Sequence, residues 1–340
     1  MSKQYASTQP PTYTNQIRNI AIVGATGNSG KHITSALLAN PSFKITALTR
    51  ATSGPPPPGV HIATIDYSNP STLVEALKNQ DVLIITLAVA APPGTATALA
   101  EAAAKAGVPW ILPNEFGTDT NDPIVGNDTF VNQSKIDDRN AIEKLGVSSW
   151  IGICTGFWYE HSLSGPEWYG IDVLDKKCVF FDDGTQRINT TTWPQVGRAV
   201  ANLLALPILP HDEADTRTTL DSFRNRMAYV SSFAVNQREM LDSVQRVTQT
   251  TDAEWTITRE NSRERYEKAK QEMFAGDRRA FGRVLYTRYF FSGENAGLVE
   301  VTRGLDNERL GLVEKEDLDE ATRKAIALAE GGYGGRYMKS

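Results

Sequence analysis

The sequence predicts an α/β fold, with a doubly wound parallel sheet followed by a smaller C-terminal substrate lobe. Two observations support this prediction. Short apolar runs alternate with helical patterns over residues 17–155, which is typical of parallel strands joined by right-handed crossovers. A glycine-rich segment follows the first apolar run and opens the first helical pattern. That is the position of the dinucleotide-binding turn in a Rossmann-type sheet.

The individual elements follow from the apolar runs and the residues that interrupt them. Strands are expected at 19–23, 43–49, 60–65, 81–87, 110–112 and 147–153, and helices at 28–39, 71–78 (capped by Ser71), 95–106 and 130–145. The proline run at 54–59 is expected to form a loop, because proline has no N–H to donate to the hydrogen bonds of a β-sheet. After residue 155 the alternation breaks, aromatic residues gather, and stretches such as 259–273 are highly charged. We therefore expect a disordered leader (1–16), an NAD(P)-binding domain (17–155) and a substrate-binding lobe (156–340), some segments of which return to the main sheet.

Composition narrows the class of protein. The chain has 340 residues, 40% hydrophobic and 22% charged, with a net charge of -5. These values are typical of a folded soluble protein and give no reason to expect a nucleic-acid partner. The longest apolar stretch, 82–91, is far shorter than the roughly 20 residues that span a bilayer. Four histidines without paired spacing and two distant cysteines predict no metal site. We expect a cytoplasmic monomer or homodimer that acts on a small molecule and has no membrane partner.

Three glycines stand between the first expected strand and the first expected helix. Gly24 permits the tight turn, Gly27 lets the backbone approach a phosphate, and Gly30 lets the helix pack closely on the strand. N–H groups at the helix start would then face the pyrophosphate. A plain strand-to-helix turn is the alternative. On the first interpretation the whole loop binds the cofactor: Gly24, Ala25, Thr26, Gly27, Asn28, Ser29 and Gly30.

Arg50 indicates which dinucleotide is bound. It ends the second expected strand, 20 residues after Gly30. An acidic residue there would bind the ribose 2′-hydroxyl of NAD, whereas an arginine suits the 2′-phosphate of NADP. No Asp or Glu occurs between Ser42 and Gly59. We therefore expect NADPH/NADP+ as the cofactor, with a solvated surface arginine as the alternative.

Lys135 is the catalytic candidate. Short-chain dehydrogenases use a Tyr four residues before a Lys, and Tyr266 with Lys270 fits that spacing, but in a charged segment that we interpret as a solvated face. The helix before the sixth strand carries Lys135, with Val131 four positions earlier, so the usual pair is missing there. A lysine whose pKa is lowered by burial can act as general acid or base, or hold the ribose hydroxyls. A surface lysine is the alternative.

The glycine loop, the segment 113–117 (PNEFG), and Lys135 with Arg139 before 141–143 together resemble the NmrA-like and isoflavone reductase-like group of atypical short-chain dehydrogenases. The resemblance covers roughly residues 18–160. It implies that Lys135 is the general acid/base, that Arg139 helps to bind NADP, and that Arg50 holds the 2′-phosphate. The second basic residue of plant members is absent from 51–59, and 158–161 differ from the plant sequence. The polar leader and proline run are similar to fungal members, which often serve secondary metabolism.

The remaining site residues are placed by the expected fold. Asp66 follows the third strand near the adenine, and Thr86 and Ala88 follow the fourth near the adenosine and phosphates. Asn114 lies in the segment after the fifth strand, and Gly156 and Phe157 form the turn beside the nicotinamide.

Aromatic and polar residues near these turns are candidates for the substrate site. The substrate candidates are Phe116, Trp158, Tyr159, His161, Trp168 and Tyr169. Aromatic rings can stack on a flat substrate, and core packing is their alternative role. His161 could relay a proton or simply form structural hydrogen bonds. Glu115 could cap the active-site loop by accepting backbone N–H bonds, a direct proton role being less favoured.

The leading hypothesis is an NADPH-dependent reductase of a small aromatic or heterocyclic metabolite, in which Lys135 supplies the proton. One alternative is a regulatory protein that senses NADP(H) without turnover. Another is a natural-product enzyme that uses the cofactor for a redox-coupled cyclisation or rearrangement, since fold does not determine chemistry.

Overall fold

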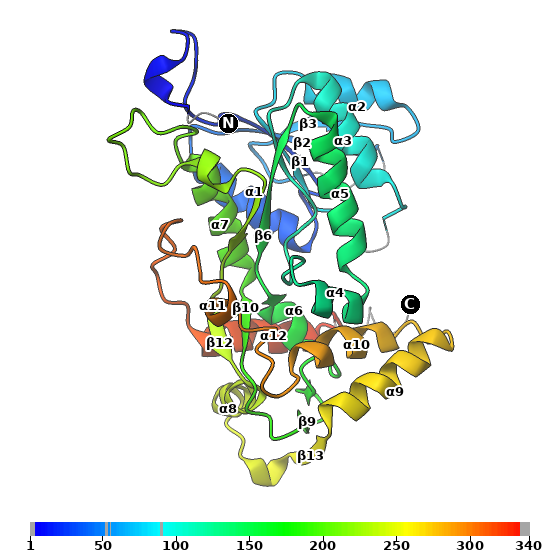
Figure 1. Cartoon of the computed structure of the whole chain (residues 1–340). Coiled ribbons are helices and arrows are strands. Elements are labelled where there is room, and N and C mark those ends of the chain that lie inside the picture. The colour runs from blue at the N-terminus through cyan, green and yellow to red at the C-terminus, as the bar shows by residue number, and fades with distance from the viewer. Residues whose placement is uncertain (1–3, 52–53, 55, 89–90, 334–340) are drawn as a thin grey trace.

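The main sheet of the protein consists of seven parallel strands in the order β11-β6-β5-β4-β1-β2-β3. The computed structural model describes residues 4–51, 54, 56–88 and 91–333. The strands are β1 (Asn19–Val23), β2 (Lys44–Thr49), β3 (His61–Thr64), β4 (Val82–Ile85), β5 (Trp110–Leu112), β6 (Ser149–Cys154) and β11 (Arg226–Tyr229). This order confirms the predicted Rossmann-type sheet (Figure 1). β11 shows that the second half of the chain also contributes to it.

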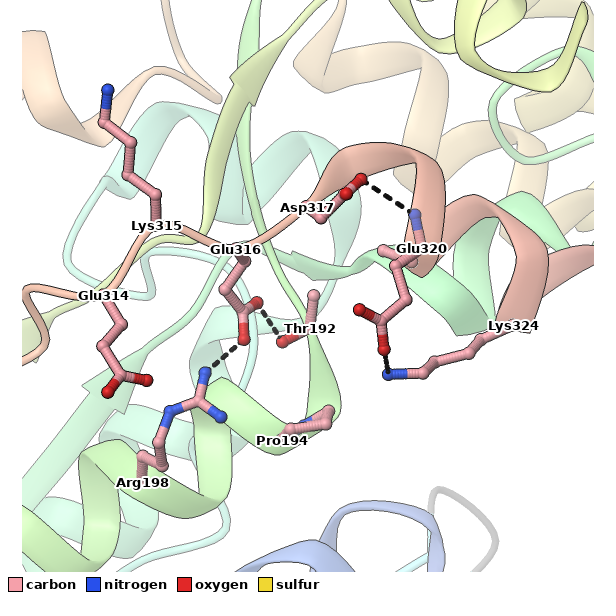
Figure 2. A pocket seen from close by; sticks show the side chains of 10 residues that line it. Thr192, Pro194, Arg198, Glu314, Lys315, Glu316, Asp317, Glu320 and Lys324 are labelled. Atoms are coloured by element: carbon pink, nitrogen blue, oxygen red, sulfur yellow. Dashed lines mark hydrogen bonds and ion pairs between the residues drawn. The ribbon is translucent and has the colours of Figure 1, made fainter. Parts of the chain in front are cut away.

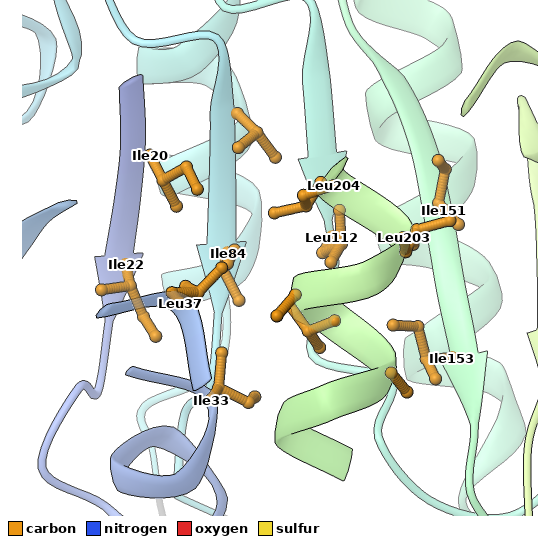
Figure 3. Close-up of a cluster of buried hydrophobic side chains, with 14 of the residues drawn as sticks. Ile20, Ile22, Ile33, Leu37, Ile84, Leu112, Ile151, Ile153, Leu203 and Leu204 are labelled. Atoms are coloured by element: carbon orange, nitrogen blue, oxygen red, sulfur yellow. The ribbon is translucent and has the colours of Figure 1, made fainter. Parts of the chain in front are cut away.

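Helices cover both faces of this sheet. One face is covered by α1 (Asn28–Leu38) and α7 (Trp193–Ala205), and the other by α2 (Pro70–Leu77), α3 (Thr95–Ala106) and α5 (Asn132–Leu145). Figure 3 shows the first face, where side chains of α1 and α7 pack against alternate residues of β1, β4, β5 and β6. Burial on both faces explains why these strands appear as continuous apolar runs in the sequence.

The smaller lobe is built around two three-stranded sheets, β12-β10-β7 and β13-β9-β8. Its strands are β7 (Phe157–Trp158), β8 (Ile171–Asp172), β9 (Lys177–Phe181), β10 (Ile188–Thr191), β12 (Phe233–Val235) and β13 (Thr256–Glu260). Its helices are α6 (Tyr159–Leu163), α8 (Gln237–Thr248), α9 (Ser262–Phe274), α10 (Ala280–Tyr289), α11 (Val299–Thr302) and α12 (Leu318–Glu330). An aromatic-rich core joins the strands to α6, α8, α10 and α12, and α9 packs against α10. The α4 helix (Pro123–Thr129) and the short 3-10 helices Ala6–Thr8, Leu220–Phe223 and Asp252–Glu254 complete the described structure.

Several predicted boundaries agree with the structure and others differ for local reasons. β1, β5 and α3 have the predicted bounds. α2 begins at Pro70 with Asn69 in the N-cap position, so the prediction that Ser71 caps it was wrong. Proline is favoured in the first turn of a helix, because a backbone N–H there would have no intrahelical acceptor. α5 begins at Asn132, two residues late, because α4 precedes it and Phe130 adopts a left-handed conformation between them.

The N-terminal segment differs from the expected disordered leader. The backbone N–H groups of Ala6 and Ser7 donate to the carbonyls of Pro210 and His211. The Asn15 side chain both donates to the Leu209 carbonyl (2.8 Å) and accepts from its N–H (2.7 Å). Residues 4–16 are therefore held by hydrogen bonds to 207–211, a partner that lies too far along the chain for local composition to reveal. Residues 1–3 lie outside the described part.

Among residues 4–51, 54, 56–88 and 91–333, no helix has the length and apolar character needed to cross a bilayer.

Glu160 is a buried carboxylate at the junction of the two lobes. It belongs to α6 and accepts the backbone N–H of Trp193, the first residue of α7, at 3.1 Å. Burial raises the pKa of Glu160 to about 7 from its ordinary 4.5. The folded chain therefore binds more protons than the unfolded chain between these pH values, and the contribution of this group to stability falls as the pH rises from about 4.5 to about 7.

Replacing Glu160 with Gln keeps an acceptor for the Trp193 N–H and removes the ionisation. The stability that Glu160→Gln gains over the wild type, measured as the difference in the free energy of unfolding, is expected to be larger at pH 8 than at pH 5 by of the order of 2 kcal/mol. Urea unfolding at both pH values measures this difference. Glu101→Gln, at an exposed position of α3, is the matched control. An equal effect of Glu160→Gln at both pH values would show that the carboxyl is not destabilised by burial.

Candidate functional site

The glycine loop connects β1 to α1 through a turn with no room for a side chain at Gly24 or Gly30. Gly24 has φ +81°, and a Cβ there would lie 2.1 Å from the Thr86 carbonyl oxygen. A Cβ on Gly30 would lie 2.0 Å from the Gly24 carbonyl oxygen. Gly27 occupies the N-cap of α1, where no side chain caps the helix. Since the first N–H groups of a helix have no intrahelical acceptor, this end of α1 can hold an anion such as pyrophosphate.

This loop lies where the strand order of the main sheet reverses, between β1 and β4. Ligands of doubly wound sheets bind in the crevice at such a point. The Thr86 hydroxyl donates to the Val23 carbonyl at 2.7 Å, and the Asn114 side chain bonds both backbone groups of Leu87 at 3.2 Å. These two predicted cofactor residues therefore fix the loops that follow β1, β4 and β5. Ala88 is exposed beside them.

Arg50 and Asp66 stand at the ends of the next two strands. Arg50 is exposed directly after β2, and its charge lowers the pKa of the nearby Tyr67, against the larger effect of burial, which raises it. Asp66 accepts the N–H and hydroxyl of Ser68 at 2.9 and 2.7 Å. Arg50 therefore has solvent access at the edge where the adenosine end of a dinucleotide would lie.

Lys135 lies on the first turns of α5, facing two carboxylates. Burial lowers its pKa, while the charges of Glu115 and Asp138 raise it by a smaller amount. Glu115 is 4% exposed. Burial raises the pKa of Glu115, and Arg139, a hydrogen bond from Thr120 and Lys135 oppose this in that order. Lys135 is thus a partly buried amine in a site of mixed charge, unlike a fully solvated surface lysine.

Arg139 is directed into the protein. It is 6% exposed, donates to Asn121 Oδ1 at 2.9 Å, and places Nε 3.5 Å from Glu115 Oε1. Its guanidinium lies 5.0 Å from the ring centroid of Trp150. These contacts give Arg139 a structural role in holding Glu115, and its expected contact with NADP stays a prediction. Glu115 accepts from the Thr120 hydroxyl and pairs with Arg139, instead of the backbone N–H groups we expected.

The turn after β6 also depends on a glycine. Gly156 has φ +61°, and a Cβ there would lie 2.3 Å from the Asn189 carbonyl oxygen. The following Phe157 is buried, with its ring stacked on Tyr286 at a centroid distance of 4.0 Å. Phe157 thus anchors the turn to the aromatic core. Whether the turn flanks a nicotinamide stays a prediction.

The aromatic substrate candidates divide into two groups. Tyr159 and Tyr169 have no exposed surface, and their hydroxyls bond Thr322 at 2.8 Å and Thr190 at 3.0 Å. Phe116 lies in the core on the α1/α7 side of the sheet. The structure therefore favours core packing for these three, which was the alternative to substrate contact.

The second group surrounds His161. The His161 ring stacks on Trp168 at a centroid distance of 4.5 Å and meets Trp158 edge-on at a centroid distance of 5.8 Å. Burial lowers the pKa of His161 to about 4, so the imidazole is neutral at pH 7. Its Nδ1 lies 3.1 Å from the hydroxyl of Tyr333, to which Asn28 Nδ2 also comes within 2.5 Å. Tyr333 was not among the predicted site residues, because an aromatic residue in a glycine-rich segment gives no local sign of its distant partners.

Two other features differ from or lie outside the expected site. Tyr266 is buried, not part of a solvated face, and its hydroxyl donates to the Asp128 carbonyl at 2.8 Å. Figure 2 shows a polar hollow in which Glu316 pairs with Arg198 and Thr192. None of the residues that line this hollow belongs to the glycine loop or to α5.

Solved structures with the same overall fold include an isoflavone reductase, with a TM-score of 0.68 at 19% identity over 91% of this chain and 99% of that one. AtPrR2, solved with NADP+ and (+)pinoresinol, has a TM-score of 0.68 at 18% identity over 92% and 99%. The NADPH-dependent quinone oxidoreductase QOR2 of Escherichia coli, complexed with NADPH, has a TM-score of 0.63 at 16% identity over 90% and 99%.

Sequence relatives identify the family. Oxidoreductase aprR of Aspergillus flavus is 30% identical over 279 residues, which cover 79% of this chain and 86% of the relative. Oxidoreductase poxI of Penicillium oxalicum is 26% identical over 317 residues, which cover 89% and 92%. The model of the NmrA-like family matches residues 16–166. The chain therefore belongs to the NmrA-like family, as its motifs predicted.

Proposed function

We propose that this protein is an NADPH-dependent reductase of a small aromatic or heterocyclic metabolite, with Lys135 as its general acid. The observation that carries the proposal is the partly buried Lys135 amine, whose pKa is lowered by burial, in a chain whose glycine loop fits a pyrophosphate. The relatives named as oxidoreductases and the structural neighbours solved with NADP+ or NADPH support it.

The glycine loop and Arg50 would hold the cofactor. The backbone N–H groups at the start of α1 would bind the pyrophosphate, with the tight approach that Gly24 and Gly30 permit. The exposed guanidinium of Arg50 would bind the 2′-phosphate, because arginine presents several fixed donors to phosphate oxygens. The segment 43–58 has no acidic side chain to compete for that guanidinium or to accept a 2′-hydroxyl.

Lys135 would deliver the proton. When bound, the reduced nicotinamide supplies a hydride to an electrophilic carbon of the substrate. The ammonium of Lys135 then protonates the adjacent heteroatom, and solvent reprotonates the amine. Burial makes this proton easier to lose, and the charges of Glu115 and Asp138 prevent the pKa from falling further. Such tuning brings a lysine closer to the pKa at which proton transfer is efficient.

The substrate class rests on the side chains around His161. Trp158 is half-buried beside His161, and a flat ring of this kind suits an aromatic or heterocyclic compound. Trp168 is buried and stacks on both His161 and Tyr286, so it supports the His161 ring from behind. The fungal oxidoreductases among the relatives support a place in secondary metabolism.

Arg50→Ala tests the cofactor choice. It is expected to weaken NADPH binding about ten- to hundredfold, the effect of losing a charge-assisted hydrogen bond. The dissociation constant for NADH should change by less than about twofold. Fluorescence titration with both dinucleotides measures this. Arg18→Ala is the control, because Arg18 is exposed and precedes β1, at the amino ends of the strands and away from Arg50. An unchanged NADPH/NADH preference in Arg50→Ala would contradict the assignment.

Lys135→Met tests the proton donor. It is expected to lower kcat at least about a hundredfold, the usual contribution of a general acid, while NADPH binding is retained. The wild type is first incubated with NADPH and a panel of imines, enones and aryl ethers, and absorbance of the reduced nicotinamide is followed. Lys144→Met, exposed on the same helix, is the matched control. Tight NADPH binding by the wild type without oxidation across the panel would favour the sensing protein instead.

A further inference from the structure

The C-terminal part of the chain returns to the glycine loop. α12 packs against α6 and α8, between the two lobes. After α12 ends, Gly332 turns the backbone with φ +73°, and the Tyr333 N–H donates to the Leu328 carbonyl at 2.9 Å. This turn directs Tyr333 back from the smaller lobe toward α1.

Tyr333 connects the two lobes through its hydroxyl. Asn28 Nδ2 donates to that oxygen at 2.5 Å, and His161 Nδ1 lies 3.1 Å from it. Because burial keeps His161 neutral, the phenol can donate its own proton to Nδ1. The Tyr333 ring also meets His161 edge-on at 5.7 Å and Trp193 at 6.0 Å. Two hydrogen bonds and two ring contacts therefore fix the phenol between α1 and α6.

This position is next to the predicted path of the dinucleotide. Asn28 is the first residue of α1 and follows Gly27, whose helix end fits the pyrophosphate. His161 lies five residues after the Gly156 turn, where the nicotinamide end is expected. A molecule that extends from the first point to the second must pass beside Tyr333.

We propose that Tyr333 is a further residue of the dinucleotide site, which closes over the bound NADPH and slows its release. This inference rests on the proposed function. The hydrogen bond uses the side-chain amide of Asn28 and leaves the backbone N–H groups of the loop out of it. The phenol contact is therefore compatible with an anion bound at the start of α1. A residue that bridges both lobes over the ligand must lose its bridge before the ligand leaves, which raises the barrier to dissociation.

The rate constants of NADPH binding test the proposal in the full chain. Stopped-flow fluorescence would give the association and dissociation rates for the wild type, Tyr333→Phe and Tyr333→Ala. Tyr333→Phe is expected to raise the dissociation rate at least about threefold, since it removes the hydroxyl that bonds Asn28 and His161, with at least the same increase in Tyr333→Ala. The association rate should change less than about twofold on the same scale.

Two controls separate this role from general stabilisation of the fold. Tyr13→Phe removes a hydroxyl that bonds only weakly, to Asn15 Oδ1 at 3.4 Å, in the N-terminal segment, and should leave both rates unchanged. Combining Tyr333→Phe with Asn28→Ala should raise the dissociation rate by less than the product of the two single effects, because both changes remove the bond between Asn28 and the phenol.

Dissociation rates equal to the wild type in both Tyr333 variants would overturn the proposal. Faster association with tighter binding would also overturn it, because it would show that Tyr333 obstructs the site. If the wild type itself failed to bind NADPH, the proposed function would be overturned. If the wild type bound NADPH normally and the Tyr333 variants had the same rates, only the role of Tyr333 would be overturned.

Discussion

The close contact of three chain segments at Gly24 is the constraint on which the rest of the structure depends. The backbone of β1 turns there, the start of α1 lies against it, and Thr86 after β4 touches both. A single methyl group on Gly24 or Gly30 would occupy space that backbone atoms already fill. The approach of α1 to the sheet determines where its N-terminus points. That helix end lies beside the strand-order reversal, which is where ligands of doubly wound sheets bind.

Two different environments lie on α5 and on α6. On the α5 side, Lys135, Glu115 and Arg139 form a buried group of charges, in which Arg139 holds Glu115 and the carboxylates moderate the effect of burial on Lys135. On the α6 side, His161 and its neighbouring rings form an apolar wall. The two sides come from different lobes, so their relative position depends on the contacts between α6, α7 and α12.

The first 155 residues were predictable because their signals are local. A strand covered on both faces must be apolar throughout, and β1, β5 and the alanine-rich α3 accordingly have the predicted bounds. The errors arise where a distant partner decides. Residues 6–15 bind 207–211, Tyr266 bonds Asp128, and Asn28 meets Tyr333, across sequence separations that no periodicity reveals. Among the aromatic residues of the smaller lobe, the sequence could not separate core from substrate candidates, and Tyr159 and Tyr169 form their hydroxyl hydrogen bonds within the core.

The return of β11 and α7 to the main sheet has a consequence for how the chain folds during synthesis. The N-terminal half alone would leave β6 as an unpaired edge and the α1 side of the sheet without the apolar residues of α7. Exposed strand edges and uncovered apolar faces promote aggregation of incomplete chains. About two thirds of the polypeptide, up to the end of β11, must therefore leave the ribosome before the main sheet can bury its core, and contacts of such long range slow folding. Completion of the main sheet thus requires residues from both halves of the chain.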